Sequence, residues 1–291
     1  MSKDNLWLIL GGTGQIGRSL QSLLQQTHIK FNTPSSKLLD IRDFERIQNY
    51  VLTVRPSVVI NCAGWTNVEK AEKNIQEANI LNGYAVDNLI RICDEVSSTL
   101  VHISTDYVFS GHKRVPYFRD DPTDPINIYG KSKLIGEKAI ESSGASKYYI
   151  FRTAWVYSKF GNNFVKSIIN KYHSGEHHIK VVNDQLGNPT FAADFAAHIV
   201  KAINLNIPFG AYHVVNSGVA SWYDLAVRTF NYLKYDSKII EAVSSSDYPS
   251  LVRRPSYTSL DSFDWSSLGL PKMRSWQSAL KFSLPQIVQD K

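Results

Sequence analysis

The first half of the chain alternates short apolar runs with longer stretches in which apolar residues recur at helical spacing. The apolar runs predict strands at residues 6–10, 29–32, 57–61, 100–104 and 148–152. Helical spacing is clear at 15–26, 42–54 and 85–96. Because strands that alternate with helices are joined by right-handed crossovers, the pattern predicts an α/β fold with a doubly wound parallel sheet of the Rossmann type.

Beyond residue 155 the alternation is less regular. The pattern predicts helices at about 162–173, 191–203 and 221–234, and strands near 179–182 and 211–215. We therefore expect a Rossmann domain over residues 1–155 and a smaller lobe over 156–291, with the chain returning to the first domain near 179–215. Open α/β sheets bind ligands at the carboxyl ends of their strands, so the lobe is expected to complete a cleft there and to bind the substrate.

The composition is that of a soluble globular protein. The 291 residues are 43% hydrophobic and 20% charged. No apolar run reaches the ~18–20 residues of a membrane span, and the N-terminus lacks a signal-peptide pattern. We therefore expect a cytoplasmic protein with no membrane contact. The net charge of +6 is dispersed among acids, with Arg253 and Arg254 as its longest cluster, which favours small anionic substrates over nucleic acid.

The cysteines and histidines do not predict a metal site. Cys62 and Cys93 lack the spacing of a zinc site and the density of a disulfide scaffold, so we expect small buried residues. The segment "HSGEHH" at 173–178 holds three histidines, but Ser174 and Gly175 interrupt it and no cluster of carboxylates or thiolates lies beside it. A solvated loop is the expected structure of this segment.

The first predicted strand runs directly into "GGTGQIGR", where Gly11, Gly14 and Gly17 precede a predicted helix. Glycine permits the positive φ of a sharp turn and the close approach of backbone to a pyrophosphate, and the N–H groups of a helix start bind that anion. The order of strand, glycines and helix predicts a dinucleotide site, with a tight turn that binds no ligand as the alternative. The spacing resembles the pattern of extended short-chain dehydrogenases/reductases.

The segment after the second strand bears on which dinucleotide binds. NAD sites commonly place an acid there to bond the ribose 2′-hydroxyl. Here the segment reads "FNTPSSK", with no acid and with Ser35, Ser36 and Lys37 compatible with a 2′-phosphate. We therefore predict NADPH, with NADH as the alternative, and expect Asp40 and Ile41 near the adenine, as in relatives of this superfamily.

A second group of polar residues predicts acid–base chemistry. Tyr129 and Lys133 open a helix at i, i+4 spacing, and the strand at 100–104 delivers Ser104, Thr105 and Asp106 to the same sheet edge. We predict that Tyr129 protonates a carbonyl oxygen as hydride arrives, that Thr105 holds that carbonyl, and that the ammonium of Lys133 lowers the pKa of Tyr129. With 15 Tyr and 32 Lys and Arg residues, chance alone gives more than one such pair, so a solvated helix is the alternative.

Collinear motifs now indicate a family. The chain resembles dTDP-4-dehydrorhamnose reductases in segments that run almost end to end: "GGTGQIG", "INCAGWTNVEKAE", "VHISTDYVFSG", "YGKSKLIGE", "FRTAWVYSKFGNNFV", "VVNDQLGNPT", "GAYHVVNSGVASWYDLA" and "RRPSYTSLD". The resemblance implies reduction of a dTDP-4-keto-6-deoxy sugar by NADPH or NADH, with Thr105, Tyr129 and Lys133 as catalytic residues.

The resemblance also implies binding residues at matching positions. For the cofactor these are Gly11, Gly14, Gln15, Ile16, Gly17, Asp40, Ile41, Cys62, Ala63, Gly64 and Lys133. For the substrate these are Thr105, Asp106, Tyr107, Tyr129, Trp155 against the sugar ring, and Asn163, Gln185 and Arg254 at the nucleotide diphosphate. An arginine suits that last position because its fork pairs with phosphate oxygens.

The chain departs from the family pattern in places. It reads "AGWT", with Trp65, where the family commonly has Ala-Ala-Tyr-Thr. Some relatives bind magnesium through glutamates at a dimer contact; no such acids are identified here, so we predict no metal and leave a homodimer open. Alternatives are a non-catalytic regulatory protein, like the methionine adenosyltransferase regulatory subunit, or another sugar-nucleotide ketoreductase, epimerase or dehydratase.

Overall fold

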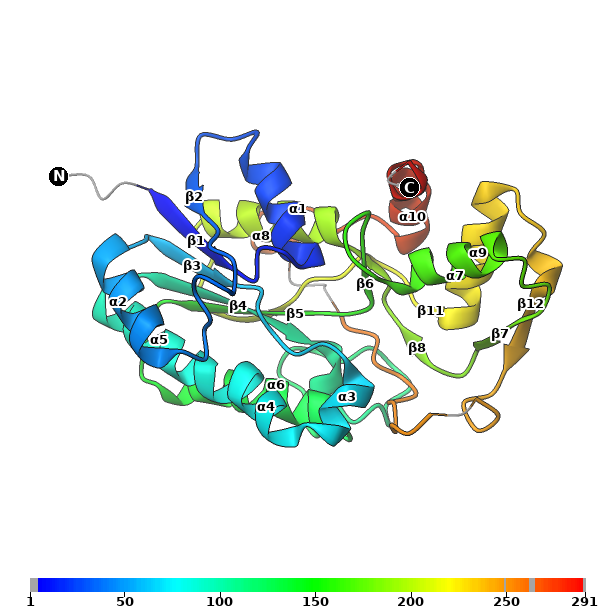
Figure 1. Cartoon of the computed structure of the whole chain (residues 1–291), viewed down its shortest axis with the longest axis horizontal. Helices are drawn as coiled ribbons and strands as arrows, with labels where there is room; N and C mark the ends of the chain where they lie inside the picture. The colour runs from blue at the N-terminus through cyan, green and yellow to red at the C-terminus, as the bar shows by residue number, and fades with distance from the viewer. Residues whose placement is uncertain (1–4, 249, 262–264, 290–291) are drawn as a thin grey trace.

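The computed structural model describes residues 5–248, 250–261 and 265–289. At its centre lies a six-stranded sheet in the order β10-β5-β4-β3-β1-β2, with every pair parallel (Figure 1). Its strands are β1 (Leu6–Leu10), β2 (Lys30–Asn32), β3 (Val58–Asn61), β4 (Thr99–Thr105), β5 (Tyr148–Thr153) and β10 (Gly210–His213). The predicted α/β doubly wound fold is therefore confirmed.

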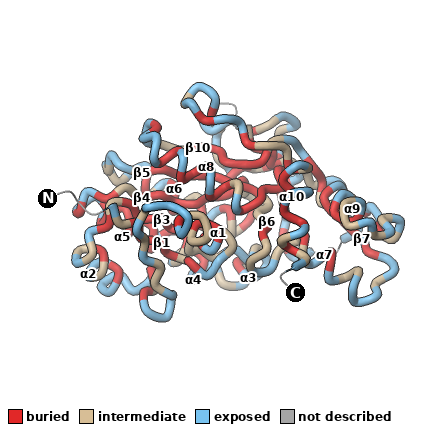
Figure 2. The backbone as a smooth tube through the Cα atoms, turned by 90° about the horizontal axis from the view of Figure 1, so that it is seen from above, coloured by how far each residue is buried: buried red, intermediate tan, exposed pale blue. Residues whose placement is uncertain are grey.

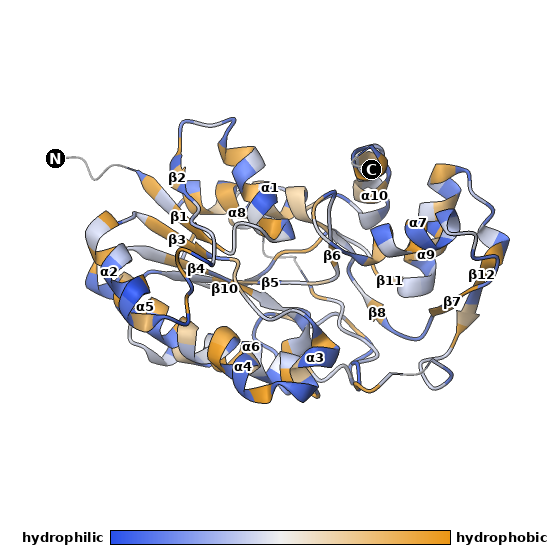
Figure 3. Ribbon diagram, viewed as in Figure 1, coloured by the Kyte–Doolittle hydropathy of each residue, from blue (hydrophilic) through white to orange (hydrophobic). Residues whose placement is uncertain are grey.

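Helices cover both faces of this sheet. One face carries α1 (Gln15–Leu24) and α8 (Ala192–Asn204), and the other carries α2 (Phe44–Val54), α5 (Ala85–Glu95) and α6 (Ile128–Ser142). Each face has its own apolar core, because side chains alternate between the faces along each strand. Buried residues run through the centre of the molecule (Figure 2), and β1 and β3 are hydrophobic (Figure 3).

The second half builds a lobe beside the sheet from short strand pairs and helices. The strand pairs are β7 (Ile179–Val182) with β12 (Ile240–Val243), β6 (Val156–Tyr157) with β9 (Thr190–Phe191), and β8 (Leu186–Gly187) with β11 (Ala220–Ser221). The lobe's core gathers α7 (Phe164–His173), α9 (Trp222–Leu233) and α10 (Trp276–Val288). The chain returns to the large sheet through α8 and β10, whereas β7 stays in the lobe. The division at residue 155 stays a prediction.

The connection from β3 to α5 holds further helical segments. These are α3 (Val68–Lys73), α4 (Ile75–Asn79) and a π-helical turn (Ile80–Tyr84). Short 3-10 turns follow β4 (Asp106–Val108) and precede β12 (Ser237–Ile239). Among the described residues, no helix combines the length and apolar character that crossing a membrane requires.

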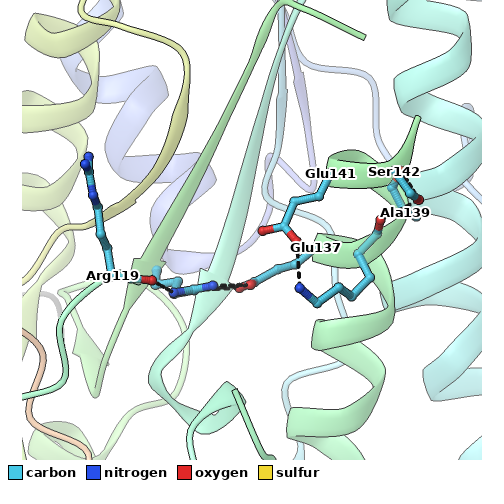
Figure 4. Close-up of polar contacts among 7 residues, drawn as sticks. Arg119, Glu137, Ala139, Glu141 and Ser142 are labelled. Carbon is cyan, nitrogen blue, oxygen red and sulfur yellow. Dashed lines mark hydrogen bonds and ion pairs between the residues drawn. The ribbon is translucent and has the colours of Figure 1, made fainter. Parts of the chain in front are cut away.

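A buried ion pair fixes α6 to the sheet. Arg152 on β5 and Glu137 on α6 approach to 2.7 Å, with side chains 4% and 0% exposed. The guanidinium also donates to the backbone carbonyl of Arg119 at 2.8 Å. Figure 4 shows the Glu137 side chain pointing from α6 toward this group. Because both charges find partners, the pair fixes α6, which carries Tyr129 and Lys133, relative to β5.

Candidate active site

The glycine turn brings the end of β1 against the end of β3. Gly11 has a φ of +72°, and a Cβ there would lie 2.4 Å from the backbone nitrogen of Ala63. A Cβ on Gly17 would lie 2.5 Å from the carbonyl oxygen of Gly11. Helix α1 starts after Gly14 with no side chain capping its first N–H groups. These open N–H groups beside a glycine-rich turn fit the pyrophosphate of a dinucleotide.

A cavity of about 630 Å³ opens at the carboxyl ends of β1, β3, β4 and β5. Most of the predicted site residues line it: Gly14, Gln15, Ile16, Gly17, Cys62, Ala63, Gly64, Thr105, Asp106, Tyr107, Tyr129, Lys133, Trp155, Asn163 and Arg254. Gln185 lines a second cavity of about 540 Å³, which shares Trp222 and Arg254 with the first. Asp40 and Ile41 line neither cavity; Asp40 pairs with Arg42 and Ile41 is buried in the core, so their predicted place near the adenine stays a prediction.

Helix α6 presents Tyr129 to this cavity. Asn127 caps the helix by accepting from the N–H of Gly130 at 2.9 Å. A Cβ on Gly130 would lie 2.1 Å from the carbonyl oxygen of Tyr107, so glycine is what allows the helix start to pack this closely on the end of β4. The Tyr129 side chain thereby lies close enough to Thr105 for the Thr105 side chain to lower the pKa of the Tyr129 hydroxyl.

The pKa of Tyr129 differs from the prediction. Burial raises the pKa of Tyr129 to about 12. Asp106 also raises this pKa, and the Thr105 side chain lowers it. Burial likewise lowers the pKa of Lys133 to about 8, against Glu137 and Cys62, which raise it. The predicted lowering of the Tyr129 pKa is therefore wrong for the protein's own groups, because desolvation of the phenolate dominates.

Asp106 lies behind Thr105 with a carboxyl that is 2% exposed. Its two oxygens accept from Thr105 Oγ1 at 3.0 Å and from Thr258 Oγ1 at 2.5 Å. Burial raises the pKa of Asp106 to about 7, although both hydroxyls lower it. Thr258 thus ties the C-terminal segment to the end of β4.

Replacing Asp106 with asparagine is expected to remove a pH dependence of stability. The pKa of Asp106 is about 7 in the folded protein, above the ordinary 3.8. The protonated carboxyl therefore stabilises the folded protein fully below pH 3.8, and this stabilisation is lost as the pH rises through about 7. The loss has an upper bound of roughly 4 kcal/mol. Thermal melts across this pH range should therefore show the Tm of the wild type falling relative to that of Asp106→Asn. A constant difference in Tm across the range would contradict the prediction.

Trp155 forms one wall of the cavity. Its backbone has a φ of +47°, and its indole stacks on that of Trp222 with ring centroids 3.6 Å apart. The ring also lies over Gly187, where a Cβ would come within 2.7 Å of it. The rigid indole pair spans the boundary between the sheet and the lobe.

Gln15 and Asn163 join the glycine turn to the lobe. The Oε1 of Gln15 accepts from Asn163 Nδ2 and from Ser158 Oγ, both at 3.0 Å. Asn163 also caps α7 by accepting from the N–H of Lys166 at 3.1 Å. Asn163 therefore has a structural role, and its predicted contact with the diphosphate stays a prediction.

Arg254 lies between the two cavities. Its guanidinium donates to Ser250 Oγ at 2.6 Å and to Glu69 Oε1 at 3.2 Å, and it bonds the Tyr107 side chain. Gln185 lies in the second cavity, where its Nε2 donates to Ser245 Oγ and its Oε1 accepts from Trp222 Nε1. A cation at this junction suits a ligand that carries negative charge across both cavities.

Comparison with known proteins identifies the family. The model described as "RmlD substrate binding domain" matches residues 6–288. The chain is 36% identical to a dTDP-4-dehydrorhamnose reductase of Streptomyces griseus over 97% of this chain and 93% of that protein. It is also 36% identical to a dTDP-4-keto-6-deoxy-D-glucose reductase of Streptomyces niveus over 98% of each. The chain belongs to the dTDP-4-dehydrorhamnose reductase family. The resemblance inferred from the motifs is thereby confirmed.

A solved member of the dTDP-4-dehydrorhamnose reductase family superimposes closely. The structure from Bacillus anthracis, a complex with NADP, has a TM-score of 0.92 and 35% identity over 97% of this chain and 99% of that one. The predicted oxidoreductase class and nicotinamide cofactor are confirmed by these relatives. The roles of individual residues stay predictions.

The sequence analysis did not predict several residues that contact the predicted site residues of this reductase-family protein. Thr258, Trp222 and Glu69 contact predicted site residues, and His102 contacts Lys133 at 3.1 Å. A polar His102 between the apolar Val101 and Ile103 of β4 was the available signal. Trp65, the departure from the family pattern, lines the cavity and donates its indole N–H to the carbonyl of Asn67. Within the described residues, no cluster of three or more His, Cys, Asp or Glu could hold a metal.

Proposed function

We propose that the protein reduces the C4 ketone of a dTDP-4-keto-6-deoxy sugar with NADPH or NADH, and that dTDP-4-dehydrorhamnose is the substrate. One observation carries the proposal: a single cavity combines the glycine turn with Thr105, Tyr129 and Lys133. The full-length relatives named as reductases of such sugars support it.

The glycine turn and the end of β3 would hold the cofactor. Gly14, Gln15, Ile16 and Gly17 would cradle its pyrophosphate at the start of α1, and the backbone of Cys62 to Gly64 would line its path. Bound there, the reduced nicotinamide supplies a hydride to the ketone carbon.

Tyr129 would supply the proton. Its raised pKa keeps the phenol protonated near neutral pH, so that its O–H can be given to the ketone oxygen as that oxygen becomes an alkoxide. Thr105 would hold the oxygen beside the phenol by turning toward it the hydroxyl that donates to Asp106 in this structure. Lys133, one helical turn after Tyr129, would bind the nicotinamide ribose and stabilise the phenolate left after transfer.

The second cavity would take the nucleotide end of the substrate. Arg254 lies at the junction, where the diphosphate would pass, and Gln185 lines the second cavity. Trp155 would face the sugar ring from the first cavity. In this arrangement the ketone would lie near Tyr129 and the base would extend into the lobe.

Incubation of the purified protein with dTDP-4-dehydrorhamnose and NADPH tests the proposal. We expect loss of absorbance of the reduced cofactor in step with formation of dTDP-L-rhamnose, identified by NMR; NADH is run in parallel. Turnover of a dTDP-4-keto-6-deoxy-D-glucose instead would reassign the substrate toward that of the Streptomyces niveus relative. Tight cofactor binding without turnover of either sugar would favour a regulatory protein, and co-purified NAD⁺ would favour an epimerase or dehydratase.

A further inference from the structure

Asn127, the residue that caps α6, also holds the segment that carries Arg254. Its Oδ1 accepts from the backbone N–H of Gly130 at 2.9 Å, and its Nδ2 donates to the backbone carbonyl of Arg253 at 3.2 Å. An N–H requires the amide oxygen and a carbonyl requires the amide nitrogen, so the two bonds fix the orientation of the amide. Asn127 is 3% exposed and lines neither of the two cavities. Its side chain therefore joins two segments of the protein and does not face a ligand.

A second connection between the same two segments runs through α3. Glu69 Oε1 accepts from the guanidinium of Arg254 at 3.2 Å. Glu72, one turn further along α3, accepts from the backbone N–H of Ile128 at 2.8 Å. Together with the bond from the cap, these two contacts close a triangle between α3, the start of α6 and the Arg254 segment.

The sides of this triangle differ in exposure. The side chains of Arg254 and Glu69 are 24% and 56% exposed, and an exposed ion pair contributes little to stability. A diphosphate at Arg254 would compete with Glu69 for the guanidinium, because both are anions that pair with its fork. The buried bond of Asn127 is then the contact that holds the Arg254 segment against α6.

The backbone on the other side of Arg254 is also held. Pro255 follows Arg254 and restricts its backbone to extended conformations. A Cβ on Gly111 would lie 2.3 Å from the Cβ of Pro255, so the two segments pack in close contact. The Arg254 backbone therefore lies between two fixed points, the bond at Arg253 and the packing of Pro255.

We propose that Asn127 is a positioning residue that sets the distance between the diphosphate site at Arg254 and the proton donor Tyr129. In a 4-keto sugar nucleotide the diphosphate is attached to C1 of the ring and the ketone is at C4, so covalent geometry fixes their separation. The protein must match that separation, because a misplacement of ~1 Å can lower the rate ~10²-fold. The proposal deepens the function proposed above and rests on it for the ligand at Arg254.

Replacing Asn127 with serine separates the two roles of this side chain. A serine hydroxyl can still cap α6, but serine lacks the amide nitrogen that donates to Arg253. We expect kcat for the dTDP-4-keto sugar to fall by about 10-fold. The Kd values of dTDP and of NADPH, measured by calorimetry, should stay close to those of the wild type, because neither ligand carries both groups whose spacing has changed. An unchanged kcat, or an equal loss of affinity for both ligands, would overturn the proposal.

The control is the same exchange at the cap of α3. Asn67 accepts from the backbone N–H of Lys70 at 2.8 Å and lies outside both cavities. Asn67→Ser should leave kcat unchanged. An equal loss of kcat in Asn67→Ser and Asn127→Ser would mean that any altered helix cap has this effect, and Asn127 would then have no positioning role.

A double-mutant cycle tests whether Asn127 acts through Arg254. In an Arg254→Ala background, Asn127→Ser should lower kcat/KM far less than it does in the wild type, because the arginine whose position it sets is gone. The same fall in both backgrounds would show that Asn127 acts on α6 alone and would overturn the proposal.

Hydrogen–deuterium exchange tests the proposal without turnover. The probe is dTDP, which carries the diphosphate but no sugar. We expect saturating dTDP to slow exchange of the backbone N–H groups of residues 128–131 in the wild type and to leave it unchanged in Asn127→Ser. Equal slowing in both proteins, or none in the wild type, would contradict the positioning role. The proposed function fails separately, if the wild type binds dTDP but does not turn over the keto sugar.

Discussion

Replacing Tyr129 with phenylalanine is expected to lower kcat by ~10² to 10⁴-fold, the usual scale of general acid catalysis. The variant removes the O–H while keeping the ring, whose edge contact with Tyr107 has centroids 5.7 Å apart. Cofactor affinity should stay close to that of wild type, because the glycine turn lies on other elements. Steady-state kinetics and a fluorescence titration with NADPH separate the two quantities.

The control for this variant is Tyr148→Phe. Tyr148 and Arg152 share the spacing of Tyr129 and Lys133 but lie on β5, and Tyr148 lies outside both cavities. Its loss should leave kcat unchanged. If Tyr129→Phe had the same kcat as Tyr148→Phe, Tyr129 would not be the proton donor.

Replacing Glu137 with alanine is expected to destabilise the fold by about 3–5 kcal/mol. The change leaves the guanidinium of Arg152 buried without its carboxylate, while it keeps the Arg119 carbonyl and the ring of Phe109 at 5.2 Å. Urea unfolding followed by circular dichroism measures the loss. The cost is large because a desolvated charge has no water to replace its partner.

A matched control lies on the next turn of the same helix. Glu141 pairs with Lys138 at 2.8 Å, with side chains 35% and 62% exposed, so Glu141→Ala should cost about 0–1 kcal/mol (Figure 4). The double variant Glu137→Leu/Arg152→Leu should recover much of the loss, since no unpaired charge is left. Equal costs for Glu137→Ala and Glu141→Ala would contradict the buried-pair account.

The sequence predicted the elements whose pattern is long and regular. Strands β1, β3, β4 and β5 and the helices at 15–26, 42–54 and 85–96 were found because apolar periodicity and burial agree there, whereas the predicted β2 is largely exposed. Two-residue strands such as β6 and β8 have no period to read, and α10 carries Pro285 within it. Their structure depends on tertiary contacts.

The candidate site was predictable where topology alone fixes it. Parallel strands end at one edge, so Thr105 and the glycine turn had to meet, and Tyr129 followed from its place after β4. Thr258 and Glu69 were not predictable, because each meets its partner across a sequence separation of more than a hundred residues. The direction of the Tyr129 pKa was missed because burial, which no local motif encodes, outweighs the lowering by Thr105.

The Gln15 amide joins the start of α1 to the start of α7 in the lobe. The amide lies at the start of α1, where the dinucleotide would bind. Its oxygen accepts a hydrogen bond from Asn163, the residue that caps α7 in the lobe. A ligand that shifts this amide changes the energy of the lobe's first helix, and a ligand that shifts that helix changes the amide. By linkage, whatever factor the cofactor applies to the affinity for the sugar nucleotide, the sugar nucleotide applies to the cofactor. Random binding with independent constants is therefore not the behaviour that this hydrogen bond favours.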